Sequence, residues 1–143
     1  MGYTADMTRT LSVGNISPRK QQVIESVKRV KEYAESLIRP GIGLVEYERL
    51  VCTHMTHELE ILGLIDPILS QEEKLILSRK YYPHRTSHFL GLDVHDVGPR
   101  DAILEPGMVI TVEPGIYIRD EGIGVRIEDD ILVTESGNEN LSK

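Results

Sequence analysis

The sequence contains few of the residues that define several large protein classes. It has one cysteine, Cys52, one phenylalanine and no tryptophan. A single cysteine can form neither an intramolecular disulfide nor a cysteine-based zinc cluster, which indicates a reducing compartment. No apolar run approaches the ~18 residues that a membrane-spanning helix needs, and the first residues contain no apolar signal-peptide core. We therefore expect a cytoplasmic protein without a membrane segment.

Basic residues are in the minority. The chain has 16 Lys and Arg against 23 Asp and Glu, which gives a net charge of −7. This balance disfavours a nucleic-acid or membrane surface, because both need a basic patch. Hydrophobic residues make up 40% of the 143 residues. That composition permits a packed core, and the length fits one domain.

The hydrophobic pattern predicts helices in the first half of the chain. Ser17 and Pro18 are typical of a helix start, and apolar residues then recur every three or four positions to about Ile38. A second helix is predicted over residues 45–62. A third, short helix over residues 70–79 begins with capping-box spacing.

Strand patterns dominate the second half. Segments 108–117 and 125–134 are rich in β-branched residues and alternate in polarity. Residues 119–124 form the short connection between these two predicted strands. Near the N-terminus, residues 3–12 also predict a short strand because of their Thr and Tyr content.

Three histidines, His84, His88 and His95, fall within the segment HRTSHFLGLDVHDVG. Imidazole can bind a metal ion or transfer a proton near neutral pH. A surface loop that happens to contain histidines is the plain alternative. By contrast, His54 and His57 lack the HExxH spacing and are interpreted as surface residues of the second helix.

Carboxylates occur in each predicted strand. Asp6 lies in the first, and Glu113 shares a strand face with a valine just before Pro-Gly. Glu128 shares a face with Arg126 and Asp130, which on pattern alone is typical of a solvent-exposed face. Together with one imidazole, such carboxylates suit Mn²⁺, Fe²⁺, Co²⁺ or Zn²⁺, and they can bridge two cations.

Four ordered motifs resemble one family. They are GYTADMTRT, HRTSHFLGLDVHDVG, LEPGMVITVEPGIYI and GIGVRIEDDILVTESGNENLS. All four resemble the pita-bread metallopeptidases, and within them Xaa-Pro aminopeptidase, also called aminopeptidase P. The resemblance covers nearly the whole chain. Prolidase, an Xaa-Pro dipeptidase, is a closer alternative than methionine aminopeptidase.

The resemblance implies an α+β fold in which a curved antiparallel sheet is backed by helices. Residues 1–143 would form the C-terminal half of the pita-bread catalytic domain. The family binds two divalent metal ions through five ligands, and we expect Mn, with Co, Zn or Fe as alternatives. By motif, Asp6 matches the second, bridging Asp ligand, His88 the His ligand, and Glu113 and Glu128 the two Glu ligands.

The same comparison assigns roles to four further residues. His84 and His95 match histidines that contact the substrate or the reaction intermediate, and they join Glu113 as the implied catalytic residues. Tyr117 and Arg126 match residues that orient the site. The implied reaction removes the N-terminal residue from a peptide whose second residue is proline.

Two features depart from the family pattern. The first Asp ligand of the family precedes the second by eleven residues, and 6 − 11 = −5, so this position and the preceding half-domain lie outside the chain. Arg85 follows the first histidine, where the family usually has glycine, so it either obstructs the substrate groove or points outward. A non-catalytic module that binds peptides or partners is therefore the alternative function. An open sheet edge at residues 3–11 also predicts a homodimer.

Overall fold

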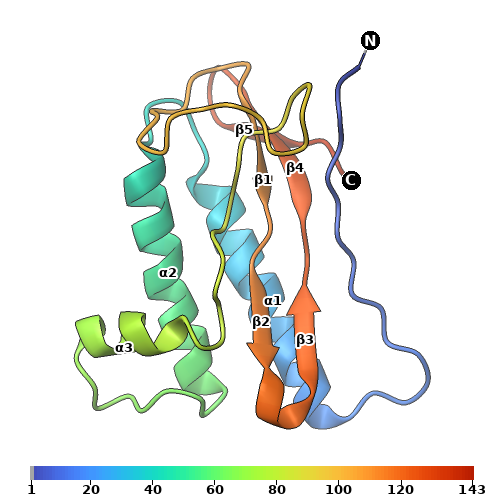
Figure 1. The fold of residues 1–143 in the computed structure, drawn as a ribbon, viewed down its shortest axis with the longest axis vertical. Coiled ribbons are helices and arrows are strands. Elements are labelled where there is room, and N and C mark those ends of the chain that lie inside the picture. Colours follow the sequence, from blue (N-terminus) through green and yellow to red (C-terminus); the bar gives the residue numbers. More distant parts are fainter. Residues whose placement is uncertain (1) are drawn as a thin grey trace.

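The computed structural model describes residues 2–143, in which three helices lie to one side of a set of short antiparallel strands (Figure 1). The elements, in chain order, are α1 (Pro18–Leu37), α2 (Leu44–Ile61), α3 (Gln71–Ser78), β1 (Val109–Val112), β2 (Gly115–Ile118), the 3-10 turn η1 (Arg119–Glu121), β3 (Ile123–Arg126), β4 (Asp129–Val133) and β5 (Asn138–Asn140). The three predicted helices therefore form within one or two residues of their expected bounds.

Each of the two predicted long strands is interrupted and forms two short strands. Strand β1 pairs antiparallel with β4, which also pairs with β5, whereas β2 and β3 form a separate hairpin. The first break falls at Glu113, whose amide donates to Thr86 O at 2.8 Å instead of to a strand, and the next residue, Pro114, has no amide hydrogen. The second break falls at Glu128, whose amide donates to Thr8 O at 3.0 Å.

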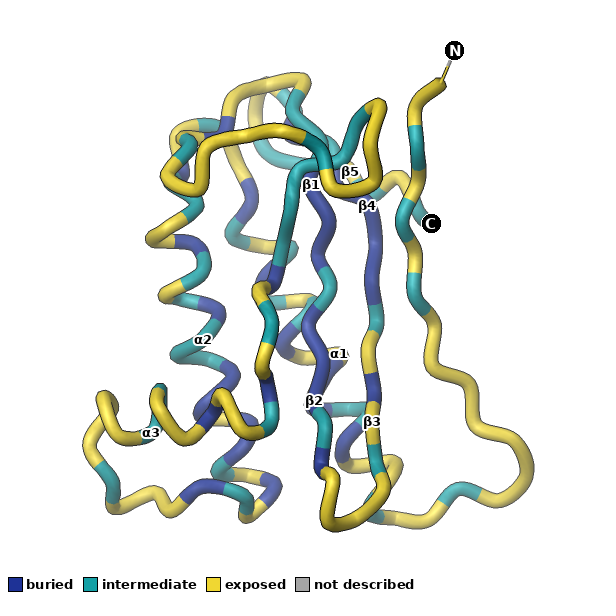
Figure 2. Tube along the Cα trace, viewed as in Figure 1, coloured by how far each residue is buried: buried dark blue, intermediate teal, exposed yellow. Residues whose placement is uncertain are grey.

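The predicted strand over residues 3–12 is wrong as a regular element. Within this segment only Thr8 forms a β-bridge, to Glu128. The physical reason is visible at Thr10, whose hydroxyl both donates to Arg126 O and accepts from the Arg126 amide. The Thr10 hydroxyl thus bonds to the backbone groups of Arg126 that would otherwise pair with the backbone of a continuing strand. The segment runs extended beside β3 and β4, and most of it is exposed (Figures 1 and 2).

The core lies between the helices and the strands. Helix α1 packs against α2 and against β1, β2 and β3. Figure 2 shows the buried residues on the facing sides of these elements. The buried residues of α1 and α2 with apolar side chains are Val23, Val27, Val30, Ala34, Tyr47, Val51, Met55 and Leu59. Among the described residues, no helix combines the length and the apolar character needed to cross a bilayer.

Local signals explain where the elements end. Ser70 and Glu73 form the predicted capping box at the start of α3. Gly63 follows α2 with φ of +68°, a left-handed conformation that glycine adopts at low cost. Strand β5 was not predicted. It places Asn138, whose side-chain amide donates to the carbonyls of Glu35 and Ile38 at the C-terminal end of α1.

One ion pair with a buried carboxylate, between Arg29 and Glu58, joins the two long helices. Burial raises the pKa of the Glu58 carboxyl, but hydrogen bonds from Arg29 and Ser26 outweigh it and hold that pKa below its usual range. The Glu58 side chain is 3% exposed, whereas that of Arg29 is 46% exposed. We expect Arg29→Met to lower the unfolding free energy by about 1–2 kcal/mol, because it leaves a buried carboxylate without its charged partner. Urea unfolding at pH 7 measures this.

The matched control is Arg49→Met, which removes the same charge from a fully exposed pair with Glu46. Exposed pairs contribute little to stability, so this variant should unfold as the parent does. Equal destabilisation by both substitutions would contradict the stabilising role assigned to the contact of Arg29 with the buried Glu58 carboxylate.

Candidate metal centre

His88 is fixed by the loop that precedes β1. Its amide donates to Thr111 Oγ1 at 3.1 Å, and its carbonyl accepts from the Thr111 amide at 3.0 Å. The neighbouring residue Phe89 bridges to Ile110 in β1. The ring Nδ1 lies 2.9 Å from Phe89 O, so Nδ1 carries the hydrogen and Nε2 keeps a free lone pair. This tautomer, inferred from the hydrogen bond, is the one that binds a metal ion through Nε2.

The two glutamates lie at the two strand breaks. Glu113 directly follows the last residue of β1, and Glu128 directly precedes the first residue of β4. The Glu128 side chain is 2% exposed, and Thr8 Oγ1 donates to its Oε2. This burial corrects the expectation of a solvent-exposed face, because non-local contacts with the N-terminal segment cover Glu128.

Asp6 reaches the site from the extended N-terminal segment. Its amide donates to Asp130 Oδ2 at 3.1 Å, which holds the segment against β4. Its own Oδ2 lies 3.5 Å from His88 Nε2, and Glu113 Oε1 lies 3.7 Å from the same nitrogen.

The four predicted metal-binding residues therefore converge. One ligand atom from each of His88, Glu113 and Glu128 lies within 4.8 Å of the other two, and the same is true of Asp6, His88 and His95. His88 belongs to both groups. Such separations are compatible with donors around cations at ~2.0–2.2 Å. The arrangement combines carboxylate oxygens with imidazole, a donor set that suits divalent metal ions.

The four other predicted residues surround this cluster. The rings of His88 and His95 meet edge to face, with centroids 4.4 Å apart. His84 Nε2 lies 2.8 Å from the hydroxyl of Tyr117. Burial raises the pKa of Tyr117, and Arg126 beside it partly opposes this shift.

Negative charge is only partly compensated at the centre. Burial, and then the nearby Glu128 carboxylate, raise the pKa of Glu113 to about 7, although His88 and Arg126 oppose the shift. The side-chain oxygens of Glu113 accept no hydrogen bond from the residues that the structure describes. A bound cation would relieve this repulsion.

Two residues of the centre were not identified from the sequence. Thr8 supplies the hydroxyl that contacts Glu128. Asp130 is buried, and its Oδ1 has no hydrogen-bond partner within residues 2–143. The sequence signal for Asp130 was its position on the same strand face as Arg126 and Glu128. Alternation alone assigns that face to solvent, which is why it does not reveal Asp130.

The remaining histidines and the cysteine lie elsewhere, as predicted. His54 on α2 stacks on Tyr33, with ring centroids 4.3 Å apart, and His57 is exposed. Cys52 is partly buried on the same helix.

The fold and the cluster of donors define a metallopeptidase of the pita-bread type. Residues 1–135 match the model of metallopeptidase family M24, and the chain belongs to that family.

The chain is similar in sequence to Xaa-Pro aminopeptidases. The chain is 42% identical to Xaa-Pro aminopeptidase of Escherichia coli (strain K12), over 99% of this chain and 35% of that protein. It is 41% identical to Xaa-Pro aminopeptidase 3 of Rattus norvegicus, over 93% of this chain and 28% of that protein. The chain thus spans about a third of the length of the curated relatives that it matches.

Solved structures give the same result. The fold matches proline aminopeptidase P II from Yersinia pestis with a TM-score of 0.89 and 40% identity, over 99% of this chain and 36% of that chain. It matches E. coli aminopeptidase P with the inhibitor Pro-Leu with a TM-score of 0.89 and 41% identity, over 99% of this chain and 35% of that chain. The expected α+β pita-bread half is confirmed.

The electrostatics of Glu113 can be measured directly in the metal-free chain. We expect a carboxyl group that titrates near pH 7 by ¹³C NMR, and Glu128→Gln should lower that pKa because it removes a neighbouring charge.

The raised pKa of Glu113 also means that the folded state holds a proton that the unfolded state releases above pH ~4.3, so stability decreases as pH rises through about 7. The control is Glu135→Gln, an exposed position after β4, which should leave the titration unchanged. A Glu113 that titrates as an ordinary glutamate would contradict the described geometry.

Proposed function

We propose that this chain is the C-terminal part of the catalytic domain of an Xaa-Pro aminopeptidase, and that Asp6, His88, Glu113 and Glu128 bind divalent metal ions. The observation that supports it is the convergence of three carboxylates, from distant parts of the sequence, on the imidazole of His88. The similarity to Xaa-Pro aminopeptidases over nearly the whole chain adds the reaction class.

The donor set favours a hard cation. Three carboxylates and one imidazole resemble the oxygen-rich environment of Mn²⁺ more than the sulfur- or nitrogen-rich sites of softer ions. We therefore propose Mn²⁺ first, with Co²⁺, Zn²⁺ and Fe²⁺ as competitors. The unpartnered Oδ1 of Asp130 adds further negative charge beside the site, which also fits a bound cation.

The metal ions, when bound, supply an activated nucleophile and polarise the scissile carbonyl. The residues of this chain orient the peptide and transfer a proton. Glu113 lies beside His88 with free oxygens and can hold a proton as the peptide bond breaks. His84 and His95 contact the peptide and stabilise charge on it. Tyr117 fixes the ring of His84 through their hydrogen bond. Arg126 lies beside Tyr117, with its Nε 4.0 Å from Glu128 Oε2.

Metal binding gives the direct test. Titration of the metal-free chain with Mn²⁺, followed by calorimetry, should show saturable binding. We expect Glu128→Gln and His88→Ala each to weaken it at least about tenfold, because even substitutions behind the ligands commonly have that effect. Glu135→Gln removes the same charge at an exposed position and should bind as the parent does. Equal binding by all variants would place the metal elsewhere.

Hydrolysis by the 143 residues alone is a separate question. By the family resemblance, a fifth ligand precedes Asp6 by eleven residues, outside these 143. We expect little release of the first residue from an Arg-Pro-led tripeptide in Mn²⁺ or Co²⁺, measured by mass spectrometry. Turnover comparable to that of a full-length relative would contradict this. Cleavage of an Xaa-Pro dipeptide but not of the tripeptide would favour prolidase, and peptide binding without any cleavage by the full-length protein would favour the non-catalytic module.

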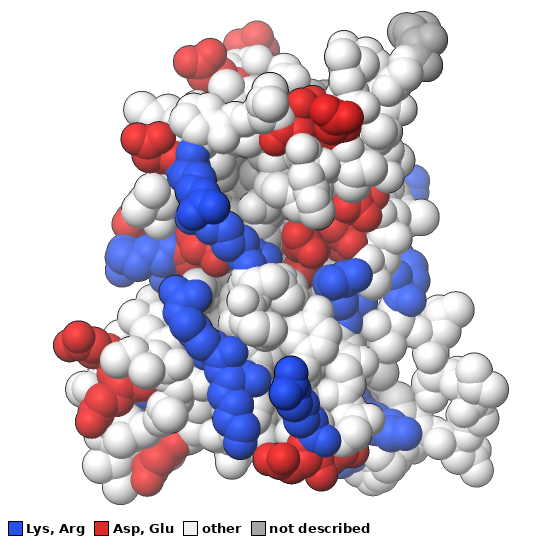
Figure 3. Space-filling model, viewed as in Figure 1, with Lys and Arg blue, Asp and Glu red and all other residues white. Residues whose placement is uncertain are grey.

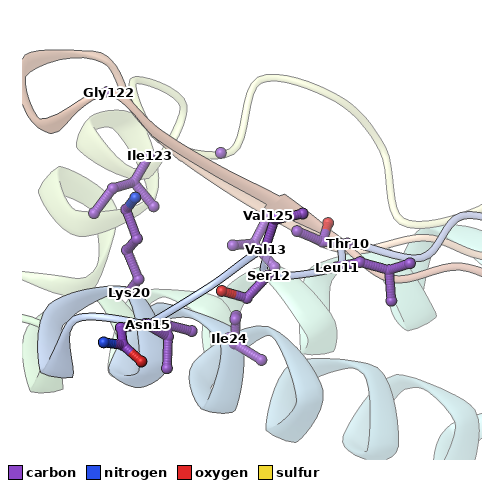
Figure 4. Close-up of a pocket in the computed structure, with 12 residues that line it drawn as sticks. Thr10, Leu11, Ser12, Val13, Asn15, Lys20, Ile24, Gly122, Ile123 and Val125 are labelled. Carbon is purple, nitrogen blue, oxygen red and sulfur yellow. The ribbon is translucent and has the colours of Figure 1, made fainter.

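We also propose that the isolated chain forms a homodimer through its N-terminal segment. Leu11 and Val13 are 83% and 98% exposed. They border a cavity of about 230 Å³ whose lining also includes Ile24 of α1 and Val125 of β3 (Figure 4). Exposed apolar side chains beside an incompletely paired segment favour association.

Sedimentation equilibrium at micromolar concentration tests this second proposal. We expect a mass of twice the 16.1 kDa of the chain. The double substitution Leu11→Ser and Val13→Ser should yield monomers, whereas Val97→Ser, at a distant position that is 90% exposed, should not. A monomeric parent chain would refute the homodimer.

A further inference from the structure

A cavity of about 270 Å³ lies between α2, α3 and the segment before His88, outside the cluster of metal-binding residues. Its lining includes Glu48, Cys52, Ser78, Arg79, Tyr82 and His84. At ~30 Å³ for each water molecule, this volume can hold a carboxylate group together with several carbon atoms.

His84 connects this cavity to the metal centre. Its ring lines the cavity, and its Nε2 lies 2.8 Å from the Tyr117 hydroxyl. Tyr82, which also lines the cavity, meets the His84 ring edge to face at 5.0 Å. A peptide that contacts His84, as the proposed function requires, would therefore lie at the edge of this cavity.

Two arginines beside the cavity have no acidic partner: Arg79 lines the cavity, and Arg85 directly follows His84, which also lines it. Arg79 and Arg85 are exposed, and within the described part of the chain neither guanidinium is in an ion pair or a side-chain hydrogen bond. Both lie near the Cys52 thiol: burial and then Glu48 raise the pKa of that thiol to about 12, and the charges of Arg79 and Arg85 oppose the shift.

The carboxylate within the cavity does not neutralise these cations by contact. Glu48 is already used, since its oxygens accept from the Thr86 amide at 3.1 Å and from Cys52 Sγ at 3.6 Å. On the same face, Figure 3 shows a band of Lys and Arg side chains beside a central group of Asp and Glu. A basic surface next to the site is notable in a chain with a net charge of −7.

We infer that Arg79 and Arg85 form a subsite for a carboxylate on the portion of the peptide that follows the cleaved bond. The inference rests on the proposed function, because that function is what brings a peptide to His84. The carboxylate can be the free C-terminus of a short peptide or the side chain of an acidic residue after proline. In either case the two arginines make the site selective for anionic peptides, since a charged hydrogen bond is stronger than a neutral one.

Four product-like peptides separate the two sources of the carboxylate. They are Pro-Leu, Pro-Leu-amide, Pro-Glu-amide and Pro-Gln-amide, each titrated into the ¹⁵N-labelled chain and followed by NMR, with Mn²⁺ and again with EDTA. We expect each anionic peptide that uses the subsite to bind roughly threefold to tenfold more tightly than its neutral partner, as for a partly exposed charge-assisted contact. Preference within the Pro-Leu pair identifies the C-terminus, and preference within the second pair identifies the acidic side chain.

Arginine variants test the assignment. Arg79→Gln and Arg85→Gln should each reduce the preference, and Arg85→Glu should reverse it. Neither side chain makes a hydrogen bond in the described structure, so folding should be retained, which far-UV circular dichroism checks. The matched control is Arg39→Gln, an exposed arginine just after α1 that does not line the cavity. It should keep the preference of the parent chain.

Equal affinity for anionic and neutral peptides, a preference unaffected by the Arg79 and Arg85 substitutions, or no peptide binding at all would each overturn the subsite. The proposed function fails by a different result. If the chain binds no metal ion but keeps a carboxylate preference in EDTA, the metal assignment is wrong and the arginine subsite stands. If it binds metal through Glu128 but shows no preference, only the subsite is wrong.

Discussion

Repulsion among carboxylates that the fold forces together is the constraint on which the site depends. Glu113 and Glu128 lie opposite each other where the ladders between neighbouring strands are interrupted, and both carboxylates lie close to His88. The cost is visible in the raised pKa of Glu113. The register runs from Val112↔Asp129 on one side of the interruption to Gly115↔Arg126 on the other, which places Glu113 and Glu128 opposite each other. The strand register and the uncompensated charge are therefore two aspects of one arrangement.

Successive side chains of strand β4 point to opposite faces, so Asp129 and Asp130 lie in different surroundings. Asp129 faces α1, where it lies 2.5 Å from Lys31 Nζ and 2.5 Å from an Arg9 nitrogen. Burial raises its pKa, but hydrogen bonds from Lys31, Asn140 and Arg9 outweigh that effect, so the pKa is lowered. The next residue, Asp130, faces the centre, and burial together with the charge of Asp6 raises its pKa. Adjacent residues thus have opposite roles: one holds β4 to the helix, and the other adds negative charge to the site.

The helices could be predicted from the sequence because caps and apolar periodicity are local signals. The converging residues could be predicted only through the motifs that resemble the pita-bread metallopeptidases. The strand breaks could not be predicted from alternation, because they depend on hydrogen bonds to residues far away in the chain, such as Glu128 to Thr8. The same limitation explains why the strand predicted over residues 3–12 and the solvent exposure predicted for Glu128 are wrong. A pattern reports which residues share a face, but the partner that covers that face comes from another part of the sequence.

The N-terminal segment is held to the body mainly by side chains. Arg9 donates to Glu128 O at 2.6 Å, and the hydroxyls of Thr8 and Thr10 supply contacts that a paired strand would make through its backbone. Segments with few ladder bonds and exposed backbones open at low free-energy cost. The proposed metal ligand Asp6 therefore lies on a segment that can detach from the rest of the chain. His88, Glu113 and Glu128 belong to the packed part. Binding of a cation across the two would order the segment, so part of the binding free energy would become local folding energy, and metal affinity would depend on ionic strength through Arg9.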